Sequence, residues 1–219
     1  MTRAVVFDVD GTLADTPGAI TALLVRVVAE HGVTADTDTV AATIGKPLEP
    51  SVAALLGRDV ADPVTVRAVA RYRELFDTDV LTRGAALLYP GVTEGLGQLV
   101  EQGFGLAVAT SKISASAEKL LAATGIRGFF GPVIGNDMVE RGKPDPQMGL
   151  LAARELGLAA EDCAYVGDTV TDMLMAAAAG MRPVAVTYGV GRAEDLAAHT
   201  AWRYDSFAAA VRLLTGAHA

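Results

Sequence analysis

Short apolar runs alternate along most of the chain with longer segments whose apolar residues recur every three or four positions. Short continuous apolar runs are typical of strands covered on both faces, and the longer pattern is typical of helices. The expected strands are residues 4–8, 105–109, 132–134, 163–167 and 183–186, and the expected helices are 92–102, 113–124, 146–156 and 170–179. This alternation predicts an α/β fold with a doubly wound parallel sheet.

Residues 15–89 break the alternation because they contain no good strand. A crossover between parallel strands needs only about a dozen residues or somewhat more, so this one carries a large excess. Its apolar spacing predicts helices at 17–30, 49–56 and 62–76. We therefore expect an inserted α-helical domain over residues 16–83 and an α/β core formed by residues 1–15 and 84–219.

The composition of the chain indicates where the protein acts and which kinds of partner it binds. The net charge is −8 and Lys and Arg form no dense cluster, which argues against nucleic acid as a partner. No apolar run approaches the roughly 20 residues that cross a bilayer, so no membrane partner is expected. The single Cys163 cannot form an intramolecular disulfide, which favours a reducing, cytoplasmic location. We expect a monomer or a homodimer.

Polar side chains follow four of the expected strands. They are Asp8, Asp10 and Thr12 after the first strand, Thr110, Ser111 and Lys112 after the second, Lys143 in the loop after the third, and Asp168, Thr169 and Asp172 after the fourth. The carboxyl ends of strands in such sheets share one edge, where ligands bind. Like charges as close as Asp8 and Asp10 repel, and a buried one is costly unless something pairs with it. A cation or a reaction is the usual reason for this arrangement.

Four stretches carry a resemblance to a known family. They are FDVDGTLADT, ATSK, RGKPDP and YVGDTVTDM, beginning at residues 7, 109, 141 and 165. In this order they resemble the four motifs of the haloacid dehalogenase-like superfamily of phosphohydrolases, and within it the phosphoglycolate phosphatase-like group. The resemblance covers nearly the whole chain. It implies that the helical insert is a C1-type cap, whose closing surface selects the substrate.

The resemblance implies a role for each motif residue, and the chemistry of phosphate esters agrees with it. Asp8 would attack phosphorus and form an aspartyl phosphate, while Asp10 would protonate the leaving group and then activate water. Lys143 would pair with the phosphoryl group and with Asp8. The expected ligands of Mg²⁺ are the Asp8 carboxylate, the Asp10 backbone carbonyl and Asp168.

Other motif residues are expected to support these groups. Thr12, Thr110 and Ser111 are the expected substrate contacts, although Thr110 and Ser111 could also be helix N-caps. Asp172 and Thr169 are expected behind the metal ligands, where Asp172 could orient Lys143 or bind the metal itself. Two features are expected to take no part in the chemistry: a solvated Lys112, and an ordinary loop over residues 188–192 that partly echoes a dinucleotide-binding loop.

Within the insert, residues 43–48 (TIGKPL) are similar to the cap loop that faces the active site in relatives. Gly45 could let the backbone approach a ligand, and Lys46 could meet a substrate carboxylate or a second phosphate. An ordinary interhelical loop with a solvated lysine is an equally good interpretation. Arg71 and Arg73 are weaker candidates. Ile20 stands where β-phosphoglucomutase-like enzymes carry a cap histidine, which argues against a mutase.

We therefore expect a Mg²⁺-dependent phosphatase acting on a small phosphorylated metabolite, phosphoglycolate-like in the first instance. An inorganic pyrophosphatase and a broad sugar- or nucleotide-phosphate phosphatase are alternatives with the same architecture. A mutase or a non-catalytic phosphate-binding protein fits the four motifs less well. Because one fold can carry many functions, the fold alone does not choose among these.

Overall fold

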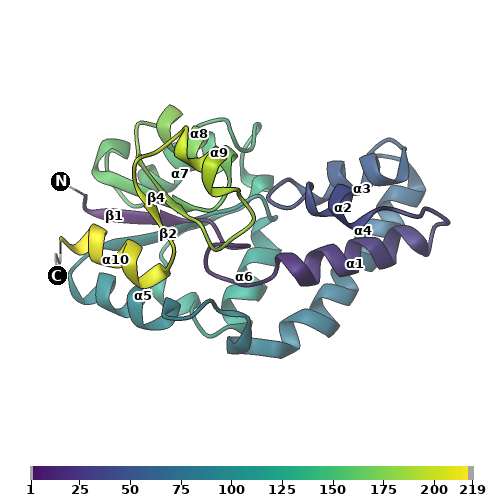
Figure 1. The fold of residues 1–219 in the computed structure, drawn as a ribbon, viewed down its shortest axis with the longest axis horizontal. Coiled ribbons are helices and arrows are strands. Elements are labelled where there is room, and N and C mark those ends of the chain that lie inside the picture. The colour runs from purple at the N-terminus through teal and green to yellow at the C-terminus, as the bar shows by residue number, and fades with distance from the viewer. Residues whose placement is uncertain (1, 217–219) are drawn as a thin grey trace.

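The computed structural model describes residues 2–216 and is built on a six-stranded, fully parallel sheet in the order β3-β2-β1-β4-β5-β6 (Figure 1). The strands are β1 (Ala4–Phe7), β2 (Gly105–Ala109), β3 (Val133–Ile134), β4 (Cys163–Gly167), β5 (Arg182–Val186) and β6 (Arg203–Tyr204). The predicted α/β fold is confirmed, and five strands lie within a residue of their predicted bounds. The sixth, β6, was not predicted because two residues beginning with an exposed arginine give no apolar run.

Helices cover both faces of the sheet (Figure 1). They are α5 (Val92–Glu101), α6 (Ser114–Ala123), α7 (Gln147–Glu155), α8 (Val170–Ala178), α9 (Ala193–Ala197) and α10 (Phe207–Thr215). Val5 and Phe7 of β1 share one core with α5, α6 and α10, while Ala4 and Val6 share another with α7 and α8. Because β1 is buried on both faces, its sequence is continuously apolar rather than alternating.

The insert between β1 and β2 is helical and extends away from the sheet (Figure 1). It comprises α1 (Pro17–Ala29), α2 (Thr37–Ala41), α3 (Leu48–Leu56), α4 (Pro63–Leu75), a π-helical turn (Phe76–Val80) and a 3₁₀ segment (Leu81–Leu87). The three predicted helices match α1, α3 and α4. Helix α2 was not predicted; its first turn is held by the Asp36 side chain, which accepts hydrogen bonds from two backbone N–H groups. The division into two domains at residues 16 and 83 stays a prediction.

The chain enters and leaves the insert through two segments that lie side by side. The N–H of Asp15 donates to the carbonyl of Leu87 at 2.7 Å, and the N–H of Tyr89 donates to the carbonyl of Leu13 at 3.1 Å. Ala14 and Leu88 form an antiparallel bridge between them. Both connections therefore meet directly after the first motif. No helix in the described part of the chain is long and apolar enough to cross a membrane.

Candidate active site

The first motif forms a tight turn at the carboxyl end of β1. The N–H of Asp8 still pairs with the carbonyl of Val166 in β4, so this carboxylate is fixed to the central strands. The chain then turns back, and the N–H of Gly11 donates to the carbonyl of Ala14. Gly11 has a φ of +82°, and a Cβ there would collide with the carboxylate of Asp168. Only glycine therefore lets the two motifs approach this closely.

Three buried carboxylates meet at this edge of the sheet. Asp8, Asp168 and Asp172 each present an oxygen within 4.8 Å of the others. Burial raises the pKa of Asp8 to about 6; Lys143 opposes the shift, and the carboxylates of Asp172 and Asp10 add to it. Burial, followed by the charges of Asp172 and Asp8, raises the pKa of Asp168 well above its usual value. The cluster is short of positive charge, which suits a bound cation.

Lys143 supplies the buried ammonium group of the cluster. Its Nζ lies 3.0 Å from Oδ1 of Asp8 and 2.7 Å from Oδ1 of Asp172, and its side chain is only 2% exposed. Burial by itself would lower the pKa of Lys143, but Asp172 and Asp8 outweigh it and raise the pKa. Lys143 is therefore charged in this site and can pair with the Asp8 carboxylate and an anionic ligand at once.

Asp172 and Thr169 are joined to each other at the start of α8, next to Asp168. The N–H and hydroxyl of Thr169 both donate to Oδ2 of Asp172, at 2.9 and 2.7 Å. The N–H of Asp172 donates in return to the hydroxyl oxygen of Thr169 at 3.3 Å, which completes a capping box at the start of α8. Oδ1 of Asp172 accepts from Lys143 and from the hydroxyl of Tyr165. Asp172 therefore contacts Lys143 directly and also lies in the carboxylate cluster, so it can orient Lys143.

Asp168 is held by residues of two other segments. Its Oδ1 accepts a hydrogen bond from the hydroxyl of Thr12 at 3.0 Å, and its Oδ2 accepts one from the N–H of Val190 at 2.7 Å. Thr12 was expected to contact substrate. Its side chain is instead fully buried and directed at Asp168, so Thr12 orients that carboxylate.

The loop over residues 188–192 was expected to be an ordinary loop, and it lies against the site. The hydroxyl of Tyr188 donates to the carbonyl of Thr12, and the N–H of Gly191 donates to the carbonyl of Asp168. A Cβ at Gly189 or Gly191 would collide with Asp168. The two glycines in this loop were the sequence signal for so close an approach.

Each carboxylate oxygen of Asp10 has a partner. Its Oδ1 accepts a hydrogen bond from the hydroxyl of Thr16 at 2.5 Å, and its Oδ2 lies 3.0 Å from Nζ of Lys112. The expectation that Lys112 is solvated is wrong: its side chain is 12% exposed, and its ammonium lies 4.4 Å from the ring centroid of Phe76. The insert brings Phe76 to this place, and no local pattern around Lys112 reveals it.

A cavity lies between the insert and this edge of the sheet. Its lining includes Asp8, Asp10, Thr110, Ser111 and Lys112 from the core, and Ile20, Gly45, Lys46, Tyr72 and Arg73 from the insert. Thr110 and Ser111, the expected substrate contacts, both line this cavity. A Cβ at Gly45 would lie 3.1 Å from Cγ2 of Thr169, so this loop of the insert touches the core.

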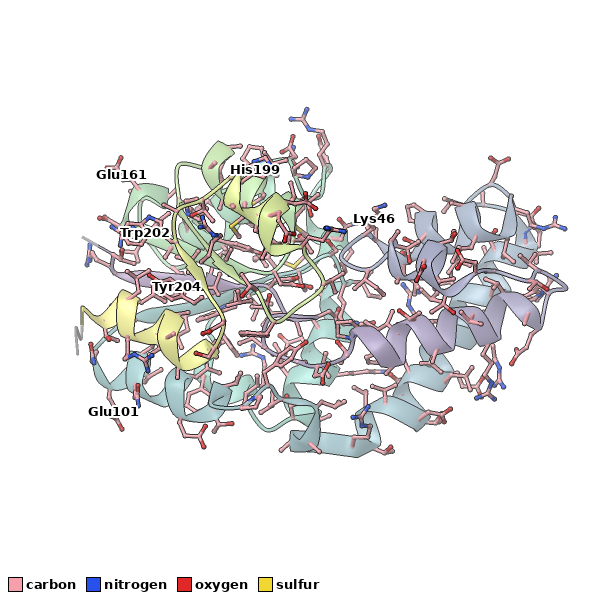
Figure 2. The ribbon with its side chains drawn as sticks, in the orientation of Figure 1. Lys46, Glu101, Glu161, His199, Trp202 and Tyr204 are labelled. Atoms are coloured by element: carbon pink, nitrogen blue, oxygen red, sulfur yellow. The ribbon has the colours of Figure 1, made fainter. Side chains whose placement is uncertain are left out.

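The cations of the insert differ in their surroundings. Lys46 lies on the part of the insert nearest the core (Figure 2). Arg73 is paired with Glu49, with Nη2 to Oε1 at 2.5 Å. Arg71 pairs with Glu30 and Glu74 on the surface and does not line the cavity.

The chain is similar in sequence to known proteins along most of its length. The family model described as haloacid dehalogenase-like hydrolase matches residues 5–186. "Probable phosphatase IndB" of Dickeya dadantii is 44% identical over 90% of this chain and 86% of its own length. A phosphoglycolate phosphatase of Pectobacterium atrosepticum is 36% identical over 89% of this chain and 84% of its own length.

Solved structures agree on the architecture. A putative haloacid dehalogenase-like hydrolase of Bacteroides fragilis is 30% identical, with a TM-score of 0.81 over 93% of this chain and 96% of that one. A β-phosphoglucomutase of Clostridium difficile aligns with a TM-score of 0.85 over 99% of this chain and 98% of its own, but at 19% identity it shows the fold alone. From its four ordered motifs, its carboxylate cluster and these matches, the chain belongs to the haloacid dehalogenase-like hydrolase family.

Proposed function

We propose that this protein is a Mg²⁺-dependent phosphatase that hydrolyses a small phosphate monoester through an aspartyl phosphate on Asp8. The observation that carries the proposal is the buried pair of Asp8 and Lys143, 3.0 Å apart, with Asp10 beside it at the cavity. The relatives named as phosphatases support the same reaction class.

The proposed reaction takes place in two successive displacements at phosphorus. An oxygen of Asp8 bonds to phosphorus, the bond from phosphorus to the ester oxygen breaks, and that oxygen takes a proton from Asp10. A water molecule then gives a proton to Asp10 while its oxygen bonds to phosphorus, and the bond to Asp8 breaks. Phosphate leaves, and both carboxyl groups return to their starting forms. Lys143 and Thr110 neutralise and orient the phosphoryl oxygens.

The residues present fit a magnesium ion. Asp8 and Asp168 are buried, their pKa values are raised, and Oδ1 of Asp8 accepts no well-aligned hydrogen bond from the described part of the chain despite its burial. Hard oxygen ligands of this kind are the ones that Mg²⁺ prefers. Asp8, Asp168 and the backbone carbonyl of Asp10 would hold the ion, and the bound ion would supply positive charge for the phosphoryl oxygens.

A panel of phosphate esters assayed with Mg²⁺ and with EDTA tests the reaction class. We expect turnover of at least one small monoester with Mg²⁺ and a loss of about 100-fold or more in EDTA, because unscreened carboxylates would repel the phosphoryl group. Adding back Mg²⁺ should restore the rate. Full activity in EDTA would overturn the metal assignment. Turnover of pyrophosphate alone would favour the pyrophosphatase alternative.

Phosphoglycolate is the proposed first substrate to test, because Lys46 could receive its carboxylate. Lys46 lines the cavity, and no carboxylate within residues 2–216 forms an ion pair with it, whereas Arg73 and Lys112 have carboxylate partners. Ile20 also lines the cavity, where it offers no proton-transfer group. That supports a phosphatase over a mutase.

Replacing Lys46 with methionine should raise the KM for phosphoglycolate roughly tenfold, since a charge-assisted contact of this kind contributes on the order of 1–2 kcal/mol. The KM for 2-hydroxyethyl phosphate, which lacks the carboxylate, should change little. Steady-state kinetics with this pair of substrates measures the difference. Lys119→Met is the matched control, because Lys119 pairs with Asp77 of the insert but does not line the cavity. Equal changes for both substrates would count against a carboxylate contact.

The proposed setting is the cytoplasm. Cys163 is the chain's one cysteine and is buried in β4, as expected of a small core residue. Burial raises the pKa of its thiol, which makes the thiolate scarce. A monomer or homodimer, and the absence of nucleic acid as a partner, stay predictions.

A further inference from the structure

We infer that Lys112 is a positioning residue, which holds the Asp10 carboxylate in line for proton transfer and is itself held by Phe76 of the insert. The inference rests on the proposed function, since it concerns the group proposed to protonate the leaving oxygen. Three contacts define the arrangement: Lys112 to Asp10 at 3.0 Å, Thr16 to Asp10 at 2.5 Å, and Lys112 to the Phe76 ring centroid at 4.4 Å.

The pair of Lys112 and Asp10 differs from the ion pairs on the surface. Its side chains, both from the core, are 12% and 11% exposed, whereas those of Lys119 and Asp77, which join core and insert, are 59% and 39% exposed. Little solvent reaches the former pair, so its attraction is weakly screened and its geometry well defined. Exposed pairs fluctuate and contribute little.

The backbone of Lys112 is also fixed. Its carbonyl accepts a hydrogen bond from the N–H of Asn136 at 2.8 Å, and its N–H lies 3.4 Å from the hydroxyl oxygen of Thr110. The side chain therefore starts from an anchored point in the loop after β2. With Thr16 bound to the other oxygen of Asp10, the carboxylate is restrained from two directions.

Phe76 links this arrangement to the insert. It begins the π-helical turn after α4, is 4% exposed, and stacks on Tyr72 with ring centroids 5.9 Å apart. A lysine ammonium over an aromatic face is attracted to it, most strongly where water is excluded. The position of Lys112, and through it the alignment of Asp10, therefore depends on the insert being packed against the core.

The dependence of the rate on the leaving group distinguishes a residue that positions Asp10 from one that only binds the phosphoryl anion or stabilises the fold. Proton donation matters most for alkyl phosphates, whose leaving oxygen is strongly basic, and least for p-nitrophenyl phosphate. A group that aligns Asp10 should affect the two substrates unequally and act on kcat more than on KM. A group that only binds the phosphoryl anion would affect both substrates alike.

The test compares Lys112→Met, Lys112→Arg and Asp10→Asn with the wild type, and uses Lys119→Met as the matched control. For an alkyl phosphate that the wild type turns over, we expect Lys112→Met to lower kcat about 10- to 100-fold, and p-nitrophenyl phosphate to lose less than about threefold. Asp10→Asn should show the same pattern more strongly. Lys112→Arg should recover part of the rate, because it keeps the charge, and Phe76→Leu should show a weaker form of the Lys112→Met pattern.

Each alternative outcome has a distinct meaning. Equal losses for both substrates, a change in KM alone, or behaviour like Lys119→Met would overturn the positioning role while the proposed function stands. A wild type that hydrolyses no phosphate ester would overturn the proposed function, and the inference with it. Circular dichroism and thermal unfolding check that the variants fold. If Lys112→Met does not fold, the same two substrates are compared in Lys112→Arg and Phe76→Leu. A leaving-group dependence equal to that of the wild type in both variants would overturn the positioning role of Lys112.

Discussion

Replacing Asp8 with asparagine should abolish turnover of phosphate esters while the protein remains folded. An amide oxygen is a poor nucleophile, so no aspartyl phosphate forms, and we expect kcat to fall by a factor on the order of 10⁴ or more. The substitution also removes one negative charge from a buried cluster in which like charges already raise the pKa values of Asp8 and Asp168. The thermal midpoint should therefore stay near the wild-type value or rise.

Steady-state rates and a thermal unfolding curve of the same preparation check both parts of this result. Asp15→Asn is the matched control, because Asp15 belongs to the same motif, is exposed, and within residues 2–216 makes a side-chain hydrogen bond only to Tyr89, at 3.4 Å. It should retain nearly full activity. A rate for Asp8→Asn within tenfold of the wild type would refute the nucleophile assignment.

Replacing Lys143 with methionine should have the largest effect on stability. It removes the buried ammonium that lies against Asp8 and Asp172 and leaves two carboxylates without their counter-charge. Removing one partner of such a buried pair typically costs about 3–5 kcal/mol. We expect a decrease of that order in the free energy of unfolding without metal, together with a large loss of activity.

Urea unfolding measured with and without Mg²⁺ tests this account. Mg²⁺ should recover part of the loss, because an ion bound by the folded state replaces some of the missing charge. The double variant Lys143→Met/Asp172→Asn should be more stable than the single one, since it removes an unpaired acid. Lys119→Met, at an exposed ion pair, should lose about 1 kcal/mol or less. A loss no larger than this control would contradict the proposed role of Lys143.

The sequence was enough to predict most of the sheet because its central strands are buried on both faces and so are continuously apolar. It did not predict α10, a nine-residue helix, nor β6 and α2, which are short and depend on an edge partner and on a single capping side chain. Segments this short carry too few positions for a period to be recognised.

The candidate site was also predicted only in part. Asp8 and Asp168 could be placed together because parallel strands end at one edge, which is a rule of topology. The contact of Lys112 with Asp10 and Phe76 could not be predicted, because it needs a side chain from the insert to arrive at a core loop. The buried position of Thr12 likewise depends on Asp168, which lies 156 residues away along the chain.

The paired segments around Ala14 and Leu88 have a consequence for how such a protein can change. Main-chain hydrogen bonds join these two connecting segments, so their pairing does not depend on the identity of the side chains in the insert. Substitutions in the insert away from Phe76 can therefore change the surface that faces the cavity while its connection to the core is kept. Under the proposed function, substrate selectivity could therefore change by substitutions in the insert, provided that the contact of Phe76 with Lys112 is retained.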